Sequence, residues 1–87
     1  MTEKFDVAWS PTARRALSRL PEKVGTAVVE FIYGPLADNP RRVGKPLRLE
    51  LEGLHSARRG DFRVIYRISD AVTIVAIEHR ADVYRPK

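Results

Sequence analysis

The chain contains no cysteine. Disulfide scaffolds and thiolate metal sites are therefore excluded, and in so small a domain the lack of disulfides suits a reducing compartment. No apolar run approaches the roughly 20 residues that span a bilayer as a helix, and the polar segment 1–6 does not resemble a signal peptide. We expect a cytoplasmic protein.

Acidic residues are also scarce, with 11 Asp and Glu against 16 Lys and Arg, for a formal net charge of +5. Twelve of the 16 cations are arginine, whose planar guanidinium binds phosphate or carboxylate through two parallel hydrogen bonds. This balance favours a polyanion or an acidic protein as partner. A solvated basic surface explains the charge alone equally well.

The first half of the chain predicts a strand and two helices. Apolar residues alternate with others over 5–9, as in a half-buried strand. Ser10 and Pro11 are typical of a helix start, with Ser10 as N-cap and Pro11 at the first helical position. Apolar residues at helical spacing follow over 13–20 and 24–32, and the very short linker between them predicts a helical hairpin.

The middle of the chain fits no single element. We expect the second helix to reach about Tyr33, because the Gly-Pro pair at 34–35 weakens it and the segment 38–40 ends it. Residues 44–46 have the composition of a loop. Leucines then alternate with charged residues over 47–52, which predicts either an edge strand or a covering loop.

Three strands are predicted in the last third, over 55–59, 62–68 and 72–78, separated by Gly-Asp and Ser-Asp turns. The last of them is apolar on both faces and should lie inside a sheet. Helices must cover one sheet face to bury both apolar stripes. We therefore expect an α+β fold in one domain, 1–87: a short N-terminal strand, a helical hairpin, and an antiparallel β-meander with the helices packed on one sheet face.

The predicted strand 62–68 has one apolar face and one basic face. Arg63 and Arg67 share the second face, since side chains alternate along a strand. If helices cover the apolar face, both arginines are open to solvent or to a ligand.

Further reactive side chains follow the next strand. A simple antiparallel hairpin places residues 77–79 opposite residues 61–63. It brings His79 and Arg80 beside the first arginine of the partner strand, and Tyr84 follows within a few residues. Cations, an imidazole and a phenol are thus expected at one end of the sheet.

Such a group suits metal-free cleavage of RNA, in which the ribose 2′-OH attacks the neighbouring phosphorus. The protein must take the 2′-OH proton, stabilise the five-coordinate phosphorane and protonate the leaving 5′-oxygen. Arginine stabilises the phosphorane, histidine serves as base or acid, and tyrosine stacks on a base or positions a proton. The carboxylates are scattered without metal-ligand spacing, so we expect no metal and no other cofactor.

Each residue also has a purely structural interpretation. Arg63 suits a solvated surface, His79 a hydrogen-bonded strand end and Tyr84 a cap on the core, and His55 is assigned a structural role. Taken one at a time, these structural interpretations are favoured.

Several motifs occur together over nearly the whole length of the chain. The most specific are Gly-Asp-Phe-Arg-Val-Ile-Tyr at 60–66 and His-Arg-x-Asp-Val-Tyr at 79–84; Ser10-Pro11, Leu20-Pro21, 44–47, 51–54 and 58–59 accompany them. With these motifs the chain resembles a RelE-type toxin of the RelE/ParE superfamily of bacterial toxin–antitoxin pairs. The resemblance implies a compact α+β fold, cleavage of mRNA in the ribosomal A site that inhibits translation, and a cognate RelB-like antitoxin in a higher-order complex.

The resemblance also implies roles for individual residues. Arg63 matches the family's phosphate-binding arginine, His79 or Arg80 matches its second cationic or acid/base position, and Tyr84 matches the tyrosine that stacks with or orients the substrate. Six further cations are expected to contact RNA: Lys45, Arg48, Arg58, Arg59, Arg67 and Arg85.

One departure concerns the general base. Some members carry two lysines on the strand before the arginine, where this chain has Leu54 and Ser56. Other members pair a glutamate of the preceding loop with a C-terminal histidine. Glu50 or Glu52, together with His79, fits that second version.

Two other functions compete with a nuclease. A ParE-like inhibitor of DNA gyrase would bind a protein and cleave no RNA, and it needs no set such as Arg63, His79 and Tyr84. A non-catalytic basic module would only bind an antitoxin or nucleic acid.

Overall fold

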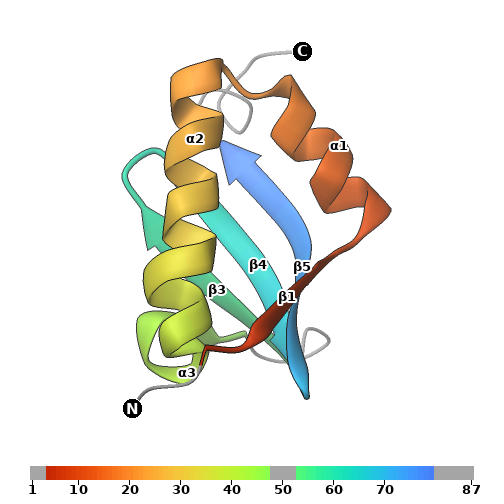
Figure 1. Cartoon of the computed structure of the whole chain (residues 1–87), viewed down its shortest axis with the longest axis vertical. Helices are drawn as coiled ribbons and strands as arrows, with labels where there is room; N and C mark the ends of the chain where they lie inside the picture. Colours follow the sequence, from red (N-terminus) through yellow and green to blue (C-terminus); the bar gives the residue numbers. More distant parts are fainter. Residues whose placement is uncertain (1–3, 48–52, 80–87) are drawn as a thin grey trace.

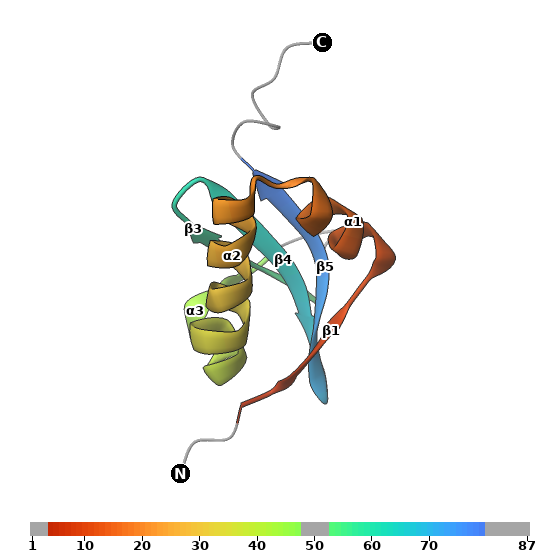
Figure 2. The same ribbon diagram turned by 45° about the horizontal axis from the view of Figure 1, so that its top comes forward.

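Helices cover one face of a five-stranded sheet in the computed structural model, which describes residues 4–47 and 53–79 (Figure 1). The strand order is β1-β5-β4-β3-β2, and the turned view shows α2 and α3 together on one side of the sheet (Figure 2). The predicted α+β fold is confirmed. Its elements are β1 (Asp6–Trp9), α1 (Pro11–Arg19), α2 (Glu22–Phe31), the π-helical turn η1 (Ile32–Leu36), α3 (Pro40–Val43), β2 (Lys45–Pro46), β3 (Leu54–Arg59), β4 (Phe62–Ile68) and β5 (Ala71–His79).

The start of α1 follows the predicted capping pattern. The Ser10 hydroxyl accepts a hydrogen bond from the Ala13 backbone N–H at 3.0 Å, and Pro11 occupies the first turn. The same hydroxyl donates to the Val75 carbonyl at 2.9 Å. Ser10 therefore both caps the helix and ties its start to β5.

The second helix runs further than Tyr33. After α2 the chain continues through η1 to Asp38, although Pro35 lies inside this stretch. Proline lacks an N–H and collides with the carbonyl four residues before it in an α-helix. A π turn widens the backbone at that point, so the helical path continues until Asn39 and Pro40.

Two short elements differ from the sequence-based expectation. Residues 40–43 form the single turn of α3, and Lys45–Pro46, expected in a loop, form the edge strand β2 against β3. Both are too short to produce a periodic pattern. The alternating leucines at 49 and 51 lie outside the described residues.

The first strand joins the sheet in a way that the sequence does not reveal. β1 pairs in parallel with β5, with Val7 opposite Val72 and Trp9 opposite Ile74. Its connection to the rest of the sheet runs through the whole helical layer. β5 therefore lies inside the sheet, as its two apolar faces predict.

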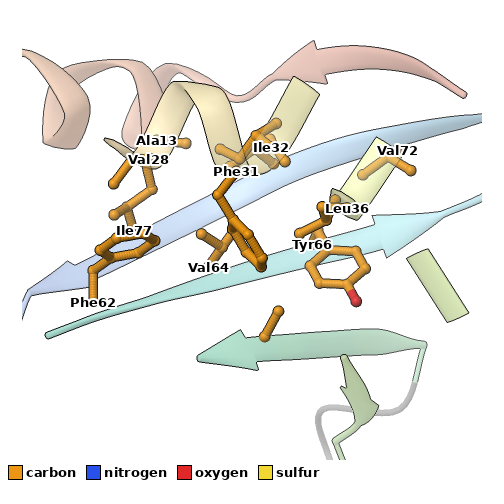
Figure 3. Packing of buried hydrophobic residues seen from close by; sticks show 12 residues of the cluster. Ala13, Val28, Phe31, Ile32, Leu36, Phe62, Val64, Tyr66, Val72 and Ile77 are labelled. Atoms are coloured by element: carbon orange, nitrogen blue, oxygen red, sulfur yellow. The ribbon is translucent and has the colours of Figure 1, made fainter. Parts of the chain in front are cut away.

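The core lies between the helices and this sheet (Figure 3). Phe31 meets Phe62 edge to face, with ring centroids 6.0 Å apart. Fully buried side chains come from both layers, among them Ala13, Val28, Ile32, Leu36 and Pro40 from the helices, and Val64, Tyr66, Val72 and Ile74 from the strands. Among the helices of the described residues, none is long and apolar enough to cross a membrane.

Candidate functional site

The sheet has one face covered by helices and one open face. On β4, Phe62, Val64 and Tyr66 are buried against the helices, whereas Arg63 and Arg67 are exposed on the other side. This alternation confirms the two predicted faces of the strand. Directly opposite residues of neighbouring strands share a face, so the strand pairing determines which side chains accompany the arginines.

The pairing of β4 with β5 differs by one residue from the simple hairpin. Near the turn Tyr66 pairs with Ile74. An irregularity between Ile65 and Tyr66 shifts the pairing of the remaining residues by one, so Arg63 pairs with Glu78. A β-bulge inserts one extra residue into one strand. The expectation that residues 77–79 lie opposite 61–63 is therefore wrong.

The shift changes the neighbour of the key arginine. His79 pairs with Phe62, so the pairing assigns it to the covered face, whereas Arg63 lies on the open face. The two residues are at the same end of the sheet but are not the predicted side-by-side pair. Glu78 takes the place expected for the histidine.

A row of charged side chains crosses the open face at this end of the sheet. Arg58 of β3 lies directly opposite Arg63 of β4, and Arg63 lies opposite Glu78 of β5. An Arg63 guanidinium nitrogen is 3.6 Å from a Glu78 carboxylate oxygen, with each side chain about half exposed. Like charges directly opposite on a sheet are destabilising, so one carboxylate partly offsets two adjacent guanidinium groups.

The other predicted RNA-binding cations divide between the two faces. Lys45 pairs with Ser56 and is on the open face, as is Arg67. Arg59 instead lies above the Phe31 ring, 5.4 Å from its centroid, on the helix side. The open face thus carries four cations from β2 to β4: Lys45, Arg58, Arg63 and Arg67.

Several predicted site residues lie outside the described residues. They are Arg48, Glu50, Glu52, Arg80, Tyr84 and Arg85. Their proposed roles therefore rest on the sequence.

A buried phenol supports the strands beneath this face. The Tyr66 hydroxyl donates a hydrogen bond to the Pro40 carbonyl at 2.6 Å, and its ring stacks on His55 with centroids 5.6 Å apart. Burial raises the pKa of Tyr66 to about 12, an effect that a backbone hydrogen bond from Gly44 opposes. A Cβ on Gly44 would collide with the Tyr66 hydroxyl and lie 2.8 Å from the Ser56 carbonyl oxygen. Gly44 is thus required for close approach, and His55 packs on the Tyr66 ring.

Glu78 is the site residue that sequence reasoning missed. An alternating pattern and a simple turn place it on the helix-covered face, and only the bulge moves it to the face of Arg63. The extra residue of the bulge is Val75 of β5, between the partners of Ile65 and Tyr66, and no glycine marks this position. The available signal was an ionisable side chain at the penultimate position of a mostly apolar strand.

The open face can bind a phosphate. Adjacent arginines present planar sets of N–H donors that match phosphate oxygens, and their cross-strand separation is the roughly 5 Å typical of paired residues. Four cations outnumber the one acid, Glu78, on the open side of β2 to β5 within the described part of the chain. Such a surface favours an extended polyanion.

The sequence relatives of this chain and the family model that matches it are all named as toxins. A family model described as the ParE toxin of the type II toxin–antitoxin system parDE matches residues 7–84. Toxin RelE of Mycobacterium tuberculosis is 57% identical over 84 residues, which cover 93% of this chain and 87% of that protein. Toxin RelG of the same organism is 52% identical over 84 residues, 93% of this chain and 97% of that protein.

Solved structures of similar fold also include a toxin–antitoxin complex and a RelE toxin. The toxin–antitoxin complex RelBE2 of M. tuberculosis contains a chain that is 47% identical, with a TM-score of 0.87, over 94% of this chain and 100% of that chain. The isolated Escherichia coli RelE toxin has a TM-score of 0.72 over 92% of this chain and 90% of its own, at 14% identity. The second similarity concerns the fold alone.

Proposed function

The chain belongs to the RelE-type toxins of type II toxin–antitoxin systems, and we propose that it is an endoribonuclease that cleaves mRNA in the ribosomal A site and so stops translation. The observation that carries the proposal is the pair Arg58–Arg63 on the open sheet face, with Glu78 beside it. Since its target is the ribosome, the proposed place of action is the cytoplasm.

In this proposal Arg63 binds the phosphate at which the chain is cut. The ribose 2′-OH attacks the adjacent phosphorus, the bond from phosphorus to the 5′-oxygen breaks, and a 2′,3′-cyclic phosphate and a 5′-hydroxyl result. Guanidinium donors stabilise the charge that develops on the phosphorane oxygens. Arg58, directly opposite, contributes a second set of donors to the same or the next phosphate.

Proton transfer needs a base and an acid. We assign the 2′-OH proton to Glu50, with Glu52 as the alternative, and protonation of the 5′-oxygen to Arg80 or His79. Since the pairing assigns His79 to the covered face, His79 would act around the end of β5, of which it is the last residue. Tyr84 stacks on or orients a substrate base. Since the Glu78 carboxylate already engages Arg63, we assign it a positioning role, in which it holds the guanidinium toward the phosphate.

A RelB-like antitoxin is the proposed partner of the chain. Chains of similar fold occur in toxin–antitoxin complexes, including RelBE2 of M. tuberculosis and RelB–RelE of Methanococcus jannaschii. An acidic antitoxin segment would neutralise the toxin by covering Arg63 and its neighbouring cations, or by displacing the C-terminal segment near Tyr84.

Inhibition of DNA gyrase is the competing function, because the family model that matches is described by the ParE toxin. Measurement of both plasmid supercoiling and mRNA integrity after expression separates the two. Cut mRNA with normal supercoiling supports the nuclease, whereas intact mRNA with relaxed plasmid supports gyrase inhibition.

The direct test of the proposed site replaces Arg63 with alanine. Loss of a donor that stabilises developing charge lowers rates about 10²–10³-fold in other enzymes, and we expect a decrease of that order in ribosome-dependent cleavage. Arg41→Ala is the matched control, because Arg41 is an exposed arginine of α3. Unchanged cleavage by Arg63→Ala would contradict the assignment.

A further inference from the structure

A second basic site lies on α1, apart from the open sheet face. A hollow of about 360 Å³ is lined by Trp9 of β1 and by one face of the helix. The helical residues, at spacing i, i+3, i+4 and i+7, are Pro11, Arg14, Arg15 and Ser18. Figures 1 and 2 both place α1 on the β1–β5 side of the molecule, away from β3.

The aromatic wall of this hollow is held in a fixed orientation. The Trp9 indole N–H donates a hydrogen bond to the Tyr33 hydroxyl at 2.9 Å. The ammonium group of Lys4 in turn donates to the Tyr33 carbonyl at 3.1 Å. Trp9 is half buried against the core, so its ring is anchored from below while part of it borders the hollow.

The two arginines of the hollow are not used in ion pairs within the described part of the chain. Arg14 and Arg15 are both exposed, and neither forms an ion pair with any residue within 4–47 or 53–79. No acidic residue lines the hollow within the same described part of the chain. Two guanidinium groups therefore lie beside the hydrogen-bonded indole, with no counter-ion among the described residues.

We propose that this hollow binds one unstacked nucleotide of single-stranded RNA, with its base against Trp9 and its phosphates on Arg14 and Arg15. Aromatic stacking combined with cations along the backbone is how proteins hold single strands without reading their sequence. An acidic peptide would use the arginines but would leave the flat indole without a stacking partner. The inference rests on the proposed function, and it adds an anchoring site apart from the phosphate at Arg63.

Trp9 makes the site directly observable, because it is the single tryptophan of the chain. The probe is a short 2′-O-methyl oligonucleotide, which cannot be cleaved because it lacks free 2′-hydroxyls. We expect it to quench Trp9 fluorescence as it binds. We also expect Arg63→Ala to retain the quenching although it lowers cleavage of ordinary mRNA about 10²–10³-fold. Absence of cleavage by the unmodified chain would overturn the proposed nuclease, while the quenching would still support the hollow.

A charge-matched pair of double variants tests the arginines. Arg14→Ala/Arg15→Ala should lower the affinity for the oligonucleotide about tenfold and reduce the slope of log K against log salt by about 1.4, for two lost phosphate contacts on a single strand. Arg19→Ala/Lys23→Ala removes the same charge from exposed positions outside the hollow and should retain the quenching. Circular dichroism establishes that both variants are folded.

Three results would overturn the inference. The oligonucleotide binds, as measured by fluorescence anisotropy, while Trp9 emission stays unchanged. The two double variants lose affinity equally. A poly-glutamate peptide quenches Trp9 as strongly as the RNA analogue, which would assign the hollow to a protein partner.

Discussion

Arg63 meets Glu78 because a bulge in the β4–β5 pairing shifts the partner strand by one residue. If Glu78 positions the guanidinium, Glu78→Ala should lower ribosome-dependent cleavage about tenfold, the order of one charge-assisted contact at an exposed site. Glu78→Gln keeps an oxygen acceptor and should restore most of the rate. Asp70→Ala, at an exposed turn, is the control. If Glu78→Gln is as impaired as the alanine variant, the carboxylate acts as a base and not as a positioning group.

Tyr66 gives a prediction about stability. Tyr66→Phe leaves the Pro40 carbonyl without its 2.6 Å hydrogen bond, and a buried unsatisfied acceptor costs about 1–3 kcal/mol in the free energy of unfolding. Urea denaturation at pH 7 measures this cost. Tyr33→Phe, at a side chain that is 46% exposed, should cost less.

The same phenol predicts a pH dependence. Because burial raises the pKa of Tyr66 from 10.0 to about 12, the folded protein keeps its proton where the unfolded chain loses it. The stabilisation is complete below pH 10 and is lost as the pH rises to about 12. The free energy of unfolding of the unmodified chain, measured by urea denaturation, should therefore fall more steeply over this pH window than that of Tyr66→Phe. Parallel curves would contradict the assignment.

At the scale of elements, replacement of a glycine by alanine should have opposite effects on stability in a helix and in a turn. Gly25 lies in α2, where an added Cβ would meet Leu17 Cδ1 at 3.9 Å, an ordinary contact. Gly25→Ala should therefore raise the free energy of unfolding by about 0.5–1 kcal/mol. Gly60, in the β3–β4 turn, has a φ of +59°, so Gly60→Ala should lower it by about 1–2 kcal/mol. Thermal or urea unfolding checks both, and a stabilised Gly60→Ala would refute the account of the turn.

Elements with a long local pattern could be predicted from the sequence. The cap at Ser10, the two faces of strand 62–68 and the turns beside it are determined by neighbouring residues. The parallel pairing of β1 and the bulge opposite residues 65 and 66 depend on contacts between distant segments, and the short π turn around Pro35 has no periodic sequence pattern of its own. The same distinction applies to the site. The local alternation places Arg63 on its correct face, whereas Glu78 was missed because its face depends on the bulge.

For the whole molecule, the distribution of charge over its faces is more informative than the net charge of +5. Among residues 4–47 and 53–79, four cations lie on the open sheet face, and two more line the hollow on α1. A basic protein this small can hold an RNA strand at separate points, while the ribosome orients the codon to be cut. Cleavage of naked RNA should accordingly be slow, and efficient cleavage without ribosomes would contradict this division of roles.

The most direct measurement maps the ends of an mRNA after the purified chain is mixed with ribosomes stalled at a known codon. The account predicts cleavage within the A-site codon, with a 2′,3′-cyclic phosphate on the upstream fragment, and its loss in Arg63→Ala but not in Arg41→Ala. Intact mRNA in the presence of folded protein, or equal cleavage by Arg63→Ala, would contradict it.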